Sequence, residues 1–456
     1  MNPGLPGHGC GFVSRGPACP VAAAAEPPSA TVNTNANAVT SDVLPIQPSV
    51  RDGESADNRF TVILGAMATA RVRAWWAHRQ GLDGGLRGVG AAEVLERTGW
   101  ARSVGGSAPY LGLFARARLG RETVDAEVAR LAIHELPAAR GCTYVLPSAD
   151  FAVGLAVGSG APEGELKSAE RHLGVTRAEV EQLCAAVIGA LEAADTPLDP
   201  AALKTAAGPA VRDLGEAGRK RGTTTTLPLA LGLLQARGDI RRVPVNGRLD
   251  QQRYGYVRWH AAPLSDVDMA RAELARRYFA WAAPASLKQF RWFSGFTASV
   301  AKKAVEALEL VPVGDSDLLL PKELTDEFAE FTEPGEPRYA LLAGIDGIHL
   351  LHREMGRLLE PADAARSVPG GRGTLGEEAD PPCHLIVDRG RIAGLWEFDP
   401  GAGEIVHQSF VGENDTLREA VAETETFVRE ELGDARSFSL DSVKSRAPRL
   451  AALRAG

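Results

Sequence analysis

Apolar residues in the middle of the chain recur at helical spacing and then give way to short alternating runs. The apolar run 227–236 predicts a helix, and the hydroxyls of Thr223–Thr226 can cap its start by accepting from the first unpaired N–H groups. Residues 241–243 and 254–258 are typical of two strands, with Asn246-Gly247 as a strong turn signal between them. A helix followed at once by a basic hairpin predicts a winged helix.

The same order of elements is predicted twice more, before and after this stretch. Before it, helices are expected at 72–79, 91–97, 109–117 and 124–130, followed by a hairpin of 133–136 and 142–146. After it, a helix capped by Asp266 or Ser265 and helices capped by Ser286 and Thr297 precede strands at 310–313 and 318–320. The three copies share an outline and no clean sequence repeat.

After Pro321 the pattern changes to recurring strand-like runs. Strands are expected at 338–343, 347–352, 384–387, 391–398 and 404–410, and an amphipathic helix from Asp415 to Leu432. This predicts a compact C-terminal domain built on a small antiparallel sheet or barrel.

These elements predict an α+β fold that is mostly helical. We expect winged helices at 67–158, 159–262 and 263–333, followed by a β-rich, barrel-like C-terminal domain at 334–456. Residues 1–66 are rich in Pro, Gly, Ala, Ser, Thr and Asn without a structural period, so we expect them to be disordered. Because Met67 can itself start the patterned sequence, we hypothesise that residues 1–66 extend the reading frame upstream.

Charge is distributed unevenly along the chain. The net charge is −8, which argues against a protein that coats nucleic acid through its overall charge. From Arg212 to His260, however, ten Arg or Lys residues stand against four Asp or Glu. This local reversal of sign indicates a local contact with double-stranded DNA.

The five cysteines are scattered and lack CxxC spacing, which predicts a reducing, cytoplasmic compartment and no zinc site. No apolar run reaches the roughly 18 residues of a membrane span. On a strand, His349 and His352 would point to opposite faces, so no metal site is expected. We expect no cofactor, and a monomer.

The order of the elements resembles the AlkZ-like family of tandem winged-helix proteins, which includes DNA glycosylases that remove alkylated or crosslinked bases. The resemblance covers roughly Met67 to the C-terminus. It is carried by MATARVRAWWAHRQGLDG, TGWARSVGG, RRVPVNGRLDQQRY, ARRYFAWAAPASLKQFRWFSG, EPRYALLAGIDG, HLIVDRGRIAGLWEFDPGAGEIV and DARSFSLDS. It implies three winged helices and a β-rich domain wrapped around duplex DNA.

The resemblance leaves activity open. Glycosylases of this family carry a Gln-aliphatic-Gln or Gln-aliphatic-Asp motif that positions the attacking water, and the nearest equivalent here is Ser103-Val104-Gly105. No other Gln or Asp occurs between Glu96 and Arg121. Ser103 is a poor base without a partner. The catalytic residues therefore stay unassigned. A DNA-binding protein without glycosylase activity, an active glycosylase that uses other groups, and a protein–protein scaffold are the three interpretations.

The candidate DNA contacts are mostly cations, and for each of them a solvated surface is the alternative. Trp75 and Trp76 are neighbours on one helix, so one is expected in the core and the other free for an interface. Tyr278, Trp281, Trp292 and Phe293 are expected in the core. The proposed contacts are Arg79 and Gln80 on the first helix, Arg102 and Ser103, the loop residues Arg219, Lys220, Arg221, Thr223 and Thr224, the hairpin residues Arg241, Arg242, Arg248, Gln251, Arg253 and Tyr254, and Lys288, Arg291, Lys302 and Lys303 on the helix-turn-helix.

Overall fold

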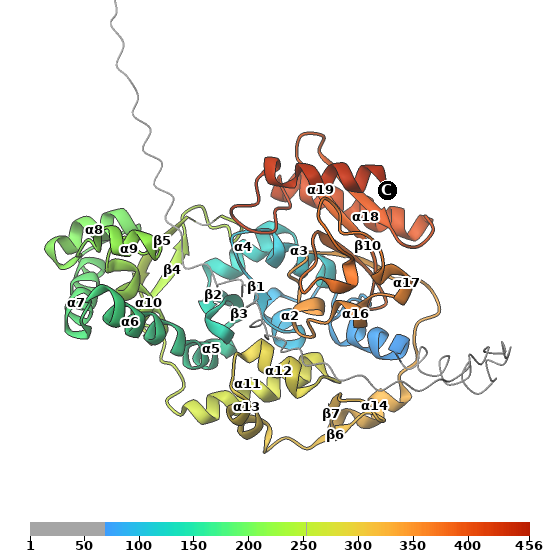
Figure 1. Cartoon of the computed structure of the whole chain (residues 1–456), viewed down its shortest axis with the longest axis horizontal. Helices are drawn as coiled ribbons and strands as arrows, with labels where there is room; N and C mark the ends of the chain where they lie inside the picture. Colours follow the sequence, from blue (N-terminus) through green and yellow to red (C-terminus); the bar gives the residue numbers. More distant parts are fainter. Residues whose placement is uncertain (1–68, 252) are drawn as a thin grey trace, which may run out of the picture. The chain divides into compact units, whose positions relative to one another are not determined.

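The structure is a computed structural model that describes residues 69–251 and 253–456. The expectations for residues 1–66 therefore lie outside the described residues. The fold is α+β, with helices and small antiparallel sheets, as the pattern predicted (Figure 1).

The first group of helices surrounds a three-stranded antiparallel sheet. The predicted hairpin is confirmed, because β2 pairs with β3 across the predicted turn. A third strand, β1, pairs with the other edge of β3 and was not predicted. The elements are the helix at 69–79, α2 (Ala91–Thr98), β1 (Ala101–Arg102), α3 (Ala108–Ala117), α4 (Arg121–Ala129), β2 (Ile133–Pro137) and β3 (Thr143–Pro147).

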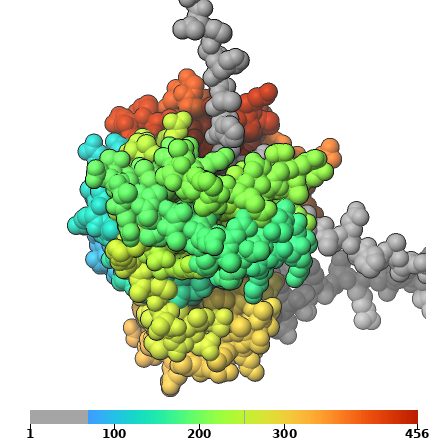
Figure 2. Space-filling model, turned by 90° about the vertical axis from the view of Figure 1, so that its left-hand side faces the viewer, coloured from blue at the N-terminus to red at the C-terminus, as the bar shows by residue number. Residues whose placement is uncertain are grey.

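The second group consists of six helices and the basic hairpin, and its helices form a continuous green surface in Figure 2. Gly238 ends α10 in the left-handed conformation, at φ +74°, as the sequence predicted. The Thr226 hydroxyl does not cap this helix, which corrects our expectation, because it accepts from the N–H of Arg212 at 3.1 Å. The elements are α5 (Phe151–Gly158), α6 (Gly160–Leu173), α7 (Arg177–Glu192), α8 (Pro200–Ala207), α9 (Gly215–Lys220), α10 (Leu227–Arg237), β4 (Ile240–Pro244) and β5 (Tyr254–Arg258).

The third group begins at the predicted caps. Asp266 accepts from the N–H of Asp268 at 2.9 Å, Ser286 forms a reciprocal capping box with Gln289, and Thr297 accepts from the N–H of Val300 at 3.4 Å. The predicted strands also pair, although each is short. The elements are α11 (Val267–Ala282), α12 (Leu287–Ser294), α13 (Ala298–Val305), β6 (Leu310–Pro312) and β7 (Leu319–Pro321).

The C-terminal part is built on a four-stranded antiparallel sheet in the order β11-β10-β9-β8. Since β11 and β8 are its two edges, the sheet is open, and the barrel-like closure is not confirmed. Phe427 stacks on Phe114 of α3 with ring centroids 4.0 Å apart. The elements are α14 (Thr325–Glu330), β8 (Tyr339–Leu342), α15 (Gly347–Leu350), α16 (Met355–Leu358), α17 (Pro361–Ala364), β9 (His384–Asp388), β10 (Arg391–Asp399), β11 (Glu404–Ser409), α18 (Asp415–Phe427) and α19 (Val443–Ala455).

Two expectations about apolar segments are wrong. Residues 347–352 form α15 and a turn instead of a strand, because the Asp346 carboxylate caps a helix by accepting from the N–H of Ile348 at 3.0 Å. Trp75 and Trp76 are both buried, so neither is free for an interface. Their indole N–H groups donate to the carbonyls of Ala283 and Pro284 at 2.8 and 3.0 Å. This shared anchor to the segment after α11 explains how adjacent residues on one helix both become core.

Candidate functional site

A buried serine–carboxylate pair lies in the three-stranded sheet. Ser103 directly follows β1, and its N–H donates to the carbonyl of Thr143 in β3 at 3.0 Å. Glu135 is on β2, on the other side of β3. The Ser103 hydroxyl donates to Oε1 of Glu135, and both residues are 3% exposed. The short β1 strand therefore brings Ser103 to a carboxylate that lies 32 residues further along the chain.

This arrangement has a chemical consequence that Ser103 alone lacks. A serine hydroxyl that donates to a carboxylate keeps its own lone pairs free to accept from a water molecule, and an ionised carboxylate can take up a proton. Together, Ser103 and Glu135 could therefore orient and activate a water. Sequence reasoning missed Glu135 because it searched only near Ser103. The signal was a glutamate between the apolar residues Ile133 and Leu136 of a strand, in the sequence IHELP.

The basic hairpin lies against this pair, and β4 and β5 lie next to β2 and β3 (Figure 1). Nη2 of Arg242 donates to the Thr143 hydroxyl at 3.4 Å, and its guanidinium lies 4.7 Å from the centre of the Tyr254 ring. Burial opposes the charge of Arg242, yet the Glu135 carboxylate raises its pKa. Burial and then the Glu135 carboxylate raise the pKa of the Tyr254 hydroxyl. Ser103, Glu135, Arg242 and Tyr254 therefore form one electrostatic cluster.

His134 lies one residue before Glu135 on β2 and belongs to a different environment. Its ring lies 5.5 Å from that of Trp259 and 6.1 Å from that of Phe151. Burial, then the charges of Arg241 and Arg242, lower the pKa of His134 to about 3. This histidine is therefore neutral and is part of the core.

The remaining hairpin residues differ in their exposure and in whether a carboxylate pairs with them. Arg241 is half-buried and Arg253 is exposed, and no carboxylate among residues 69–251 and 253–456 forms an ion pair with either. Gln251 is half-buried. Arg248 is bound to Asp250 at 2.9 Å and to the carbonyl of Leu432 at 2.9 Å, so its guanidinium holds the hairpin connection to the C-terminal part.

Arg102 is on β1, the edge strand of the three-stranded sheet opposite β2. Its Nη1 donates to the carbonyl of Thr143 at 2.7 Å, and its guanidinium lies 5.5 Å from the centre of the Tyr144 ring. Arg102 and Arg242 thus both reach Thr143, one through the carbonyl and the other through the hydroxyl.

The predicted basic loop before α10 is partly helical, because Arg219 and Lys220 are the last two residues of α9. Arg219, Lys220 and Arg221 are exposed, and Lys220 lies 2.9 Å from Glu216 on its own helix. Thr224 is exposed and Thr223 is half-buried. The chain folds back here, because the carbonyl of Thr224 accepts from the N–H of Leu214 at 2.9 Å.

The helix-turn-helix cations are all exposed. Lys303 pairs with Asp268 at 2.6 Å and Lys288 lies 3.9 Å from Glu354, whereas Arg291 and Lys302 form no ion pair within the described chain. The core expectation holds for the neighbouring Tyr278, Trp281 and Phe293, which are buried. Trp292 is half-buried, with the guanidinium groups of Arg140 and Arg353 at 4.0 and 4.3 Å from its ring.

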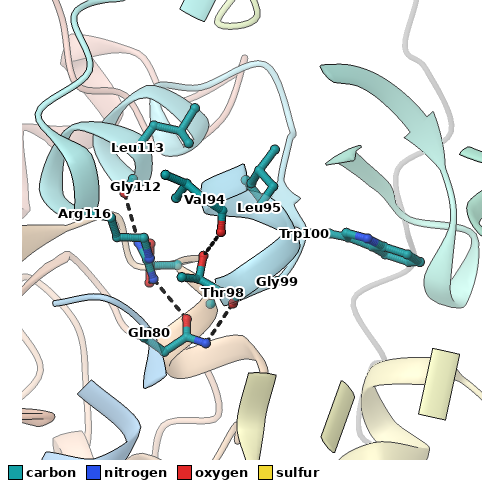
Figure 3. Close-up of a pocket in the computed structure, with 12 residues that line it drawn as sticks. Gln80, Val94, Leu95, Thr98, Gly99, Trp100, Gly112, Leu113 and Arg116 are labelled. Atoms are coloured by element: carbon teal, nitrogen blue, oxygen red, sulfur yellow. Dashed lines mark hydrogen bonds and ion pairs between the residues drawn. The ribbon is translucent and has the colours of Figure 1, made fainter. Parts of the chain in front are cut away.

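The first helix ends beside a small cavity that is lined mostly by apolar groups (Figure 3). Gln80 is fully buried: its amide donates to the carbonyls of Thr98 and Trp281 at 2.7 and 3.1 Å, and its carbonyl accepts from Arg116 at 3.0 Å. The Arg116 guanidinium in turn donates to both oxygens of the Asp346 carboxylate, at 2.8 and 2.9 Å. The cavity of about 20 Å³ has room for about one water molecule. Gln80 therefore links the end of the first helix to α2, α3 and α11, and it does not face solvent.

Arg79, on the same helix, also makes an internal contact. Its Nη2 donates to the carbonyl of Ala280 at 2.9 Å, and burial lowers its pKa.

Among residues 69–251 and 253–456, no cluster of His, Cys, Asp and Glu is arranged to hold a metal ion, and no helix is long and apolar enough to cross a membrane.

Comparisons with known proteins point to one family. The model of the AlkZ-like DNA glycosylase family matches residues 101–438, well over half of the chain. The solved structure of the DNA glycosylase AlkZ from Streptomyces sahachiroi superposes with a TM-score of 0.61 at 22% identity, covering 81% of this chain and 98% of that one. No curated protein matches the sequence. The matched range includes Ser103, Glu135 and the hairpin β4–β5, and the chain belongs to the AlkZ-like DNA glycosylase family.

Proposed function

We propose that this protein binds duplex DNA and serves in DNA repair by recognising damaged bases. One observation supports this most strongly: the basic hairpin β4–β5 adjoins the buried Ser103–Glu135 pair through Arg242 and Thr143. A basic hairpin and a serine–carboxylate pair thus lie side by side. The family to which the chain belongs is named for DNA glycosylases, and AlkZ, which has a similar fold, is itself described as a DNA glycosylase.

In this proposal the free cations hold the DNA backbone. Arg241 and Arg253 on the hairpin, and Arg291 and Lys302 on the third group, are not neutralised by a carboxylate in the described part of the chain. Such cations release counterions when they contact phosphates, which drives binding. Gln80 and Arg248 are left out of this surface, because internal hydrogen bonds occupy them.

The predicted segments 67–158, 159–262 and 263–333 act as tandem winged helices around the duplex, and 334–456 supports them. In this division α5 belongs to the first winged helix and α14 to the third. The repeated order of helices followed by antiparallel strands supports this assignment. A winged helix binds with a helix in the major groove and a hairpin against the backbone.

The test is direct. The full chain is titrated into fluorescently labelled duplexes, undamaged or carrying an alkylated base, at several salt concentrations. We expect binding that weakens linearly with the logarithm of salt concentration and that favours the damaged duplex. Affinity that does not respond to salt, or no binding at all, would overturn the proposal and favour a protein–protein scaffold.

A second candidate function is base excision, and the Ser103–Glu135 pair is the observation that favours it. In this reaction the oxygen of a water bonds to C1′ of the sugar, and the C1′–N bond breaks with its electron pair leaving on the base. The proton of the water passes to the Glu135 carboxylate. A purine alkylated at N7 or N3 carries positive charge, so cleavage of the C1′–N bond neutralises it and the base leaves readily. Damaged bases must first leave the stack, at a cost of about a few kcal/mol.

Base excision is tested with the same duplexes, by cleaving abasic sites with alkali and resolving the strands. Strand breaks that depend on the protein would establish excision. Tight binding without breaks would leave damage recognition as the function.

A further inference from the structure

The segment between α18 and α19 exposes apolar side chains. We call residues 434–442 the C-terminal strap. Within the strap, Phe438 and Leu440 are 45% and 62% exposed, and Val443 directly after it is 52% exposed. Exposed apolar groups that gather in one place mark interaction surfaces. Three such residues within six positions therefore indicate a surface that binds a partner.

The strap is held rigidly under these side chains. The buried Asp441 carboxylate accepts from the N–H of Ser437 at 3.1 Å and from Arg449 at 2.9 Å. At the other end of the strap, Asp434 pairs with the fully buried Arg446 at 2.8 and 2.9 Å. Phe438 and Leu440 are thus presented from a fixed backbone, and they are not part of a loose loop.

The strap is bonded to the loop that follows Ser103. The N–H of Ser439 donates to the carbonyl of Val104 at 3.1 Å, and the N–H of Ser107 donates to the carbonyl of Arg436 at 3.0 Å. The two segments lie so close that a Cβ on Gly106 would be 2.4 Å from the carbonyl oxygen of Ser437. The exposed apolar residues are therefore fixed next to the candidate site.

The strap also contacts the loop that joins β4 and β5 of the basic hairpin, since Nη2 of Arg436 donates to the carbonyl of Asp250 at 2.6 Å. Two cations lie near the strap in the sequence. The exposed Lys444 directly follows Val443, and Arg102 is two residues before Val104, which the strap contacts. An apolar surface beside cations suits a polyanion that has an apolar interior, and duplex DNA is such a partner.

We propose that Phe438 and Leu440 form an apolar wedge that enters the base stack of duplex DNA at the damaged position. Such wedges unstack neighbouring bases and hold the distorted duplex, which assists extrusion of a base into a nearby site. This inference rests on the proposed function, because it takes duplex DNA as the ligand. It adds a contact to the bases, whereas the cations of the hairpin contact the backbone.

The test uses the full chain and a duplex that carries 2-aminopurine beside an abasic-site analogue, because unstacking raises the fluorescence of 2-aminopurine. The variant is Phe438→Ser with Leu440→Ser. Met269→Ser is the matched control, since Met269 at the start of α11 is an apolar residue whose exposure of 59% lies between those of Phe438 and Leu440. We expect the double variant to lose the fluorescence rise and to bind the abasic duplex about tenfold more weakly, as when one base no longer stacks on a side chain. Its salt dependence should stay that of the wild type.

The outcomes are distinguishable. A fluorescence rise in the double variant equal to that of the wild type overturns the wedge and leaves the proposed function intact. No binding of any duplex by the wild type overturns both. Light scattering that gives a wild-type dimer and a monomeric double variant would show that a second copy of the chain occupies this surface, which also overturns the wedge. Near-ultraviolet circular dichroism of the variants checks that they are folded.

Discussion

The Ser103 hydroxyl donates a hydrogen bond to the Glu135 carboxylate, and this contact joins the end of β1 to β2 across the sheet. It gives the serine of the ARSVGG segment the acidic partner that its own neighbourhood in the sequence lacks. The basic hairpin adjoins the same pair through Arg242. Binding and any chemistry are therefore expected at one place.

Replacing Glu135 by glutamine tests the chemistry. Glutamine can still accept from Ser103 but cannot take up the proton of water, so we expect release of an alkylated base to fall at least about 100-fold, as for loss of a general base. Duplex affinity should be unchanged. Glu122→Gln, on the exposed face of α4, is the control. Base release by Glu135→Gln at the wild-type rate would remove Glu135 from the reaction.

The Arg116–Asp346 ion pair is expected to be a main structural link between the first helices and α15. Asp346→Ala leaves the buried guanidinium without its carboxylate and also removes the cap of α15. We expect the free energy of unfolding to fall by about 3–5 kcal/mol, the cost of breaking a buried pair from one side. Urea denaturation followed by tryptophan fluorescence measures it. Asp415→Ala, on an exposed salt bridge of α18, is the control and should have little effect. A loss as small as that of the control would contradict a buried structural role.

His134 should make the protein less stable in acid. Its pKa is about 3 in the folded protein because of burial and the nearby Arg241 and Arg242, and about 6.5 when unfolded. Below pH 6.5 the unfolded chain therefore binds a proton that the folded chain does not, so stability is lost as the pH falls from about 6.5 towards 3.

The measurement compares the wild type with His134→Gln by urea denaturation at pH 7 and pH 5. We expect the wild type to lose about 2 kcal/mol more than the variant between these two values. The buried His349 and His352, whose pKa values burial also lowers, remain in both proteins and cancel in the comparison. Equal losses in the two proteins would show that His134 is not kept neutral by the fold.

Local signals predicted much of the fold because they are set within a few residues. Gly238 ends its helix and Ser286 caps another as expected, since a left-handed turn and a capping hydroxyl depend on neighbours in sequence. Residues 347–352 were misread as a strand because the run is apolar and the capping role of Asp346 was overlooked. Short apolar runs fit either element when periodicity is the only guide.

The candidate site was only half predictable, because its partners come from different elements. Ser103 and the hairpin cations were proposed from the sequence, but the hydrogen bond of Ser103 with Glu135 depends on β1 pairing with β3, and a two-residue strand leaves no pattern. Burial was equally hidden. Gln80 was proposed to contact DNA, yet Arg116 and Asp346, far away in sequence, enclose it.

The central claim is that the hairpin beside Ser103 and Glu135 binds duplex DNA, and the salt dependence of binding tests it most directly. Arg241→Ala with Arg253→Ala removes the two hairpin cations that have no carboxylate partner among the described residues, whereas Arg242 is left in place because it interacts with Glu135. Arg271→Ala with Arg276→Ala, two arginines paired to carboxylates on α11, is the matched control. We predict that the hairpin variant lowers the slope of log affinity against log salt concentration by about 2, because each neutralised phosphate contributes about 0.9 to that slope, while the control leaves it unchanged. A hairpin variant with the wild-type slope would contradict the account.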